Sequence, residues 1–154
     1  MRVGRLRSGE LLAGAGAVVL LMALFLDWVG PVGKSGWEAL GWLVLAIAAA
    51  AIALAAWLVV ATAVARPVTQ VVAADVLTSV VSAIAFVVLA LRALVFQPGP
   101  NEVVELRYGA WVGLAGALAT TIGAWWSLAD ERTDAPESAY VPPAPRPAPP
   151  PASS

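Results

Sequence analysis

The feature that most constrains this chain is an apolar stretch at residues 39–65, which contains no charged residue. Its 27 residues exceed the roughly 20 that a helix needs to cross a hydrocarbon core of about 30 Å. Three more largely apolar stretches occupy residues 9–26, 75–96 and 108–129. These four stretches predict four membrane-spanning helices, because a soluble core does not need apolar segments of this length.

The composition agrees with a membrane environment. Hydrophobic residues make up 60% of the 154 residues and charged residues only 12%, whereas about 25% of a typical soluble domain is charged. We predict an all-α fold, a four-helix transmembrane bundle with a disordered Pro-rich C-terminal tail. The predicted membrane domain is residues 9–129, between a basic N-terminus (1–8) and the tail (130–154).

Neither cysteine nor histidine occurs in the sequence. Their absence removes disulfides, thiol redox chemistry, zinc sites built on these residues, histidine-ligated haem and triads with a histidine base. The formal net charge of −1 supplies no basic surface for nucleic acid. We therefore expect no enzyme activity, no cofactor, no metal site and no nucleic-acid partner.

The N-terminus has two interpretations. Arg2, Arg5 and Arg7 precede an apolar run at residues 11–26, as they would in a secretory signal peptide. A signal peptide ends in small residues at its cleavage site, whereas this run ends in bulky side chains, which favours a retained helix. Glu10 then lies at the inner rim of the membrane, either beside water or as a working acid.

The distribution of basic residues predicts the orientation of the chain. The segments predicted to lie inside contain Arg2, Arg5, Arg7, Arg66, Arg132 and Arg146. The outer segments contain Lys34 and Arg107, with Arg92 near the outer rim. Because basic residues concentrate on the cytoplasmic side, we expect a multi-pass protein of the plasma (inner) membrane with both termini in the cytoplasm.

The tail is predicted to lack regular structure. A charged cluster at residues 130–134 ends the last apolar stretch, and eight prolines follow it. Closely spaced prolines favour a disordered or polyproline-like chain. The tail is either a solvated spacer or, through the minimal PxxP motif of Pro142 and Pro145, a segment that binds a partner.

Tryptophan residues mark the predicted membrane interfaces, because an indole ring suits the headgroup level. The predicted interfacial anchors are Trp28, Trp37, Trp42, Trp111, Trp125 and Trp126. Three of them lie in the segment at residues 27–42, which we expect to be the first outer loop. The alternative function of this loop is an outward-facing recognition patch with Asp27, Lys34 and Glu38 as its polar groups.

The third predicted helix has a polar face made of Asp75, Thr78, Ser82 and Arg92, which follow one another at helical spacing. The two charges are 17 residues apart, about 26 Å along a helix, and cannot pair directly. One interpretation places Asp75 at the inner rim and Arg92 at the outer rim, with the hydroxyls bonded to their own helix. The other interpretation is a polar path or a small ligand cleft between helices.

The fourth predicted helix has a seam of small residues at spacings of three and four. The seam consists of Gly109, Gly113, Gly116, Thr120, Gly123 and Ser127. Small side chains let two helices approach closely in lipid, so the seam predicts a packing face. This face is directed either into the bundle or toward another subunit.

Several motifs together resemble a known family. They are a tryptophan just past the first helix, GWEALGW at residues 36–42, GAWVGLAGA at residues 109–117 and the charged stop at residues 130–132. They look like the small four-span integral membrane proteins of actinobacteria, which are mostly uncharacterised. The resemblance covers residues 1 to about 132 and implies a four-span fold, but it supplies no active residues.

Two functions remain open. The first is a non-enzymatic scaffold or accessory subunit, whose partners are the lipid bilayer and either another membrane protein or further copies of this chain. The alternative is a small transporter or channel subunit that uses the polar face of the third helix. Dry packing of that face favours a scaffold, and a continuous cavity along it favours transport.

Overall fold

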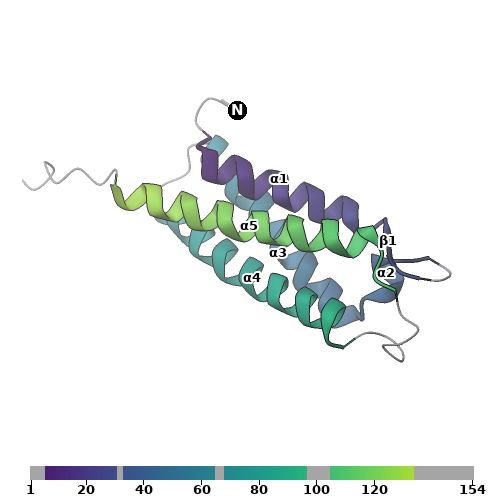
Figure 1. Cartoon of the computed structure of the whole chain (residues 1–154). Coiled ribbons are helices and arrows are strands. Elements are labelled where there is room, and N and C mark those ends of the chain that lie inside the picture. The colour runs from purple at the N-terminus through teal and green to yellow at the C-terminus, as the bar shows by residue number, and fades with distance from the viewer. Residues whose placement is uncertain (1–5, 31–32, 65–67, 97–104, 134–154) are drawn as a thin grey trace, which may run out of the picture.

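The computed structural model describes residues 6–30, 33–64, 68–96 and 105–133 (Figure 1). Its elements are α1 (Ser8–Ala23), β1 (Asp27–Val29), β2 (Lys34–Ser35), α2 (Gly36–Ala39), α3 (Trp42–Ala63), α4 (Val68–Leu94) and α5 (Tyr108–Thr133). Helices dominate and the only strands in these ranges are two short ones, so the predicted all-α class is confirmed.

The four long helices lie side by side, and the two strands and α2 gather at one end of them (Figure 1). Each long helix contacts two neighbours, in the order α1, α5, α4, α3 around the bundle. The most extensive contact is between α1 and α5, and the least extensive is between α3 and α1. The bundle is therefore tight along one side and loose along another.

Among the described residues, three helices are long and apolar enough to cross a membrane. These segments are Trp42–Ala63 with a mean hydropathy of 2.8, Gln70–Leu94 with 2.3 and Tyr108–Ala129 with 1.3. The fourth apolar helix, α1, has 16 residues, which gives it a length of about 24 Å. The chain is thus a membrane protein by the length and composition of its helices.

The third predicted helix begins earlier than expected. The stretch predicted to form it was residues 75–96, but α4 starts at Val68. No helix breaker occurs between Pro67 and Asp75, and a proline is well tolerated at the start of a helix. The predicted start of this helix was therefore wrong, and about two turns precede Asp75.

The first and second predicted helices are shorter than expected. The first was predicted over residues 9–26 but α1 ends at Ala23, where the chain tightens into a turn. The second was predicted from residue 39, but Leu40 is extended and separates α2 from α3. Apolar residues continue through both breaks, so hydropathy could not locate them.

The additional structure is a small cap over one end of the bundle. Strand β1 pairs with β2 in antiparallel fashion, and Val29 forms an isolated bridge with Leu106. The Gly30 N–H donates to the Glu105 carbonyl at 2.9 Å, and the Arg107 N–H donates to the Trp28 carbonyl at 3.0 Å. The cap therefore joins the chain after α1 to the chain before α5.

The predicted tail starts later than expected, because α5 continues to Thr133. Residues 134–154 and most of the predicted basic N-terminus lie outside the described residues. The predictions of a disordered tail and of a PxxP ligand at Pro142 and Pro145 are therefore not tested here.

Candidate functional site

The seam of small residues on α5 faces α1 and the chain that follows it. A Cβ atom on Gly16 of α1 would lie 2.5 Å from the backbone N of Thr120, and one on Gly116 would lie 2.6 Å from the N of Leu20. A Cβ atom on Gly123 would overlap the backbone of Ala13. The two helices therefore touch backbone to backbone inside one chain.

This contact continues over the whole length of α1. Residue numbers rise along α1 as they fall along α5, from Gly9 beside Ser127 to Leu20 beside Gly116. Beyond the helix, a Cβ atom on Gly109 would lie 2.5 Å from the Asp27 carbonyl oxygen. Thr120 fits because its hydroxyl donates to the Gly116 carbonyl of its own helix at 2.9 Å. The seam is thus used within the bundle.

Trp28 differs from the other predicted anchors. Its side chain is 1% exposed, and its indole N–H donates to the Ala23 carbonyl at 2.6 Å. It packs where Gly113 and Gly36 leave room for a ring. Placing it at the lipid interface was wrong, because a residue enclosed by protein cannot face headgroups. The other five anchors are exposed: Trp37, Trp42, Trp111, Trp125 and Trp126.

Two of the three polar groups proposed for a recognition patch have structural partners. Asp27 forms an ion pair with Arg107 at 3.7 Å. Glu38 accepts hydrogen bonds from the backbone N–H and the hydroxyl of Ser35, at 3.2 and 3.3 Å. These contacts hold the cap together and cap helix α2. Lys34 and Glu38 are both exposed, so the structural contact of Glu38 lies at the surface.

The inner part of the α4 polar face is packed inside the protein. Asp75, Thr78 and Ser82 are each fully buried. The Ser82 hydroxyl donates to the Ser79 carbonyl at 3.3 Å, as expected for a side chain bonded to its own helix. The Thr78 hydroxyl has no hydrogen-bond partner among the described residues. Burial of this kind resembles dry helix packing rather than the wall of a water-filled path.

Arg92 lies far from these residues, at the capped end of the bundle. Its guanidinium donates to the carbonyls of Ala39, at 3.3 Å, and Phe96. It also lines a cavity of about 10 Å³ beneath the cap, which is too small for more than about one water molecule. The four residues of the predicted polar face are therefore not brought together in one cleft.

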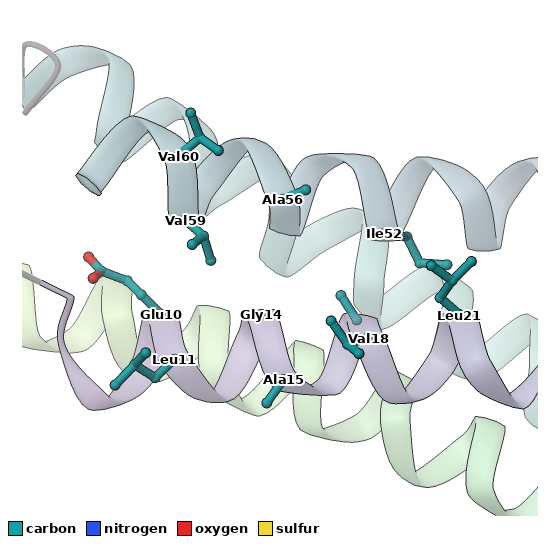
Figure 2. A pocket seen from close by; sticks show the side chains of 11 residues that line it. Glu10, Leu11, Gly14, Ala15, Val18, Leu21, Ile52, Ala56, Val59 and Val60 are labelled. Atoms are coloured by element: carbon teal, nitrogen blue, oxygen red, sulfur yellow. The ribbon is translucent and has the colours of Figure 1, made fainter. Parts of the chain in front are cut away.

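A groove opens instead on the loose side of the bundle, between α1 and α3 (Figure 2). Its cavity volume is about 590 Å³, within the roughly 300–1,000 Å³ of small-molecule sites. Representative lining residues are Glu10, Gly14 and Leu21 of α1 and Ile52, Ala56 and Val59 of α3. Of the described residues that line it, Glu10 alone has a polar side chain.

The sequence analysis missed this groove. It also missed the small residues of α1 that pack against the seam on α5. The signal for the contact was present, because Gly9, Ala13, Gly16 and Leu20 recur at spacings of four, three and four. The groove had no such signal, because it depends on which pair of helices is least closely packed. Glu10 was singled out only for its position at the inner rim.

Comparisons with protein-family models, with curated proteins and with solved structures gave no match. The resemblance to small four-span actinobacterial proteins therefore stays a prediction.

Proposed function

We propose that this membrane protein is a non-enzymatic scaffold or accessory subunit, and that α3 is the helix that meets its partner. The supporting observation is how little of α3 the chain itself covers. Only 22% of its spanning window is buried, against 33% in α4 and 44% in α5. A helix so open on its own has a large surface for another membrane protein or a second copy.

The composition of this surface suits close helix contact. Ala46, Ala50, Ala53 and Trp57 are all exposed and follow one another at spacings of four, three and four, so they form one stripe. Lipid gives no hydrophobic drive to helix association, and small side chains allow the backbone approach that replaces it. We expect the partner helix to pack on this alanine stripe.

The test is recovery of a partner with substituted chains. Ala50→Phe places a large ring in the middle of the alanine stripe and is expected to abolish recovery of the partner from mild-detergent extracts. Ala56→Phe, a matched change on the groove side of the same helix, is expected to leave recovery intact. A protein recovered with this chain counts as the partner only if, when it carries the tag itself, it recovers this chain in return. Equal recovery with both variants would exclude the alanine stripe as the interface.

A transporter or channel subunit is the second candidate, because Asp75 is a fully buried carboxyl group in a membrane helix. Intramembrane acids are costly and commonly functional. Asp75→Asn combined with Arg92→Gln separates the two functions. A scaffold is expected to stay expressed and bound to its partner, with no change in proton or K⁺ flux across reconstituted vesicles. Flux that the native chain supports and the double variant loses would favour transport.

We further propose that α1 is a fourth spanning helix and that both termini lie in the cytoplasm. Support comes from the antiparallel contact of α1 with α5 and from the exposed apolar side chains of Leu11, Val18 and Met22, which need a hydrocarbon environment. The chain has no cysteine, so the labelling of a single introduced cysteine shows on which side of the membrane that residue lies. A membrane-impermeant maleimide should label Lys34→Cys in intact cells and Ser8→Cys only after permeabilisation. Identical labelling of both would overturn this orientation.

A further inference from the structure

Glu10 is a buried carboxyl group at one end of an otherwise apolar groove. Its side chain is 3% exposed and projects from α1 toward α3, near Val59 (Figure 2). From there the groove extends along α1 to Leu21. A single charge in such a position gives the groove two different ends, one polar and one aliphatic.

The carboxyl group retains capacity for a ligand. Its Oε2 accepts a hydrogen bond from the backbone N–H of Arg7 at 2.8 Å, which caps α1. A carboxylate has about four acceptor sites on its two oxygens. The hydrogen bond to the N-terminus of α1 therefore fixes the side chain without using all its acceptor sites. A donor that arrives through the groove can reach the acceptor sites that are left.

The dimensions of the groove match one leaflet of a membrane. Glu10 and Leu21 are 11 residues apart, or about 16 Å along a helix, close to half of a hydrocarbon core of about 30 Å. Gly9, the neighbour of Glu10, packs against Ser127, next to the exposed Trp125 and Trp126. These rings place Glu10 at the headgroup level and the groove beside the acyl chains.

We propose that this groove binds an aminolipid, with one acyl chain between α1 and α3 and the headgroup ammonium on the carboxylate of Glu10. The acyl chain alone gives little preference, because any lipid tail is equally apolar. The preference comes from the head. A primary ammonium donates charge-assisted hydrogen bonds to a carboxylate in a low-dielectric setting, a quaternary ammonium has no N–H to donate, and an anionic head is repelled.

The groove also opens directly to lipid. Leu11, Val18 and Val60 line it and are at the same time exposed on the bundle surface. An acyl chain can therefore enter sideways from the bilayer without separation of the helices. The interior is narrow at Gly14, where a Cβ atom would already lie 3.0 Å from the Val59 side chain.

The test is photo-crosslinking of the full chain in phosphatidylcholine vesicles. The probes are phosphatidylethanolamine and phosphatidylglycerol, each in trace amount and with the same diazirine-bearing acyl chain. The phosphatidylethanolamine probe is expected to label peptides covering residues 10–21 and 52–60 and to be displaced by unlabelled phosphatidylethanolamine. Equal labelling by the two probes, or labelling confined to other helices, would overturn the proposal.

Three variants locate the site. Glu10→Gln keeps the helix cap, because an amide oxygen accepts the same hydrogen bond, and is expected to lower phosphatidylethanolamine labelling about tenfold through loss of one charge-assisted interaction. Ala56→Phe fills the groove without touching Glu10 and should lower labelling by both probes. Ala50→Phe, on the alanine stripe, should change neither. Unchanged labelling in Glu10→Gln or Ala56→Phe, or reduced labelling in Ala50→Phe, contradicts the assignment.

Discussion

Gly123→Ala is expected to destabilise the folded protein by about 3 kcal/mol, the upper part of the range for overpacking. The added methyl group would overlap the backbone of Ala13, and it would lie 2.7 Å from the Gly9 carbonyl oxygen. Backbone atoms at a helix contact cannot move singly, so α1 must shift away from α5. The free energy of unfolding in detergent micelles, measured by circular dichroism against denaturant, gives the size of the effect.

Gly14→Ala is the matched control, since it makes the same change on α1 at a position that faces α3. Its new methyl group would meet only the end of the Val59 side chain, at 3.0 Å, which can move. Alanine also favours a helix over glycine by about 1 kcal/mol. We expect Gly14→Ala to be neutral or slightly stabilising. Similar losses in both variants would mean that the α1–α5 contact is not the tightest part of the bundle.

Trp28→Ala is the second substitution with a large expected effect, a loss of about 3–5 kcal/mol, as for other buried aromatic side chains. The indole fills the space above Gly113 and beside Gly36 and donates to the Ala23 carbonyl. Without it, a large cavity opens between the cap, the end of α1 and Gly113 of α5. The same denaturant unfolding measures the loss.

Two companion variants separate packing from hydrogen bonding. Trp28→Phe keeps much of the ring but removes the N–H donor. The Ala23 carbonyl still accepts from the Leu26 N–H at 3.0 Å, so a smaller loss of about 0.5–1.5 kcal/mol is expected from the one missing hydrogen bond. Trp42→Ala removes a ring that is 81% exposed and should leave the stability of micelle-bound protein nearly unchanged. Comparable effects of Trp28→Ala and Trp42→Ala would show that the cap does not stabilise the bundle.

Much of the fold was accessible from the sequence because two kinds of pattern are strong in membrane helices. Long stretches with few charges located the four helices, and the spacing of Gly109, Gly113 and Gly116 identified the side of α5 on which close contact occurs. Both patterns depend on local composition and helical geometry alone. They need no knowledge of which helix lies next to which.

The cap was not accessible in the same way. Strand β1 has three residues and β2 has two, too few for an alternating pattern to be recognised. A tryptophan beside an apolar stretch is typical of a lipid interface, and only the tertiary structure shows that Trp28 is enclosed. The turn depends on Gly33, whose φ of 69° is favourable for glycine, but the loop contains several other glycines.

The candidate site was the least predictable part. The polar face of α4 was the most conspicuous chemical feature of the sequence, yet Asp75, Thr78 and Ser82 are buried among helices. The groove between α1 and α3 is lined by ordinary aliphatic residues whose proximity is a property of the whole bundle. Glu10 gains its interest from this proximity and not from any motif around it.

The tight contact between α1 and α5 also has a consequence for how the protein is made. Synthesis proceeds from the N-terminus, so α1 is made long before its close partner α5 exists. The glycine surface of Gly9 and Gly16 stays uncovered until the ribosome has passed Ser127. A nascent chain stopped before that point would present this surface of α1 to whatever membrane helix is nearby.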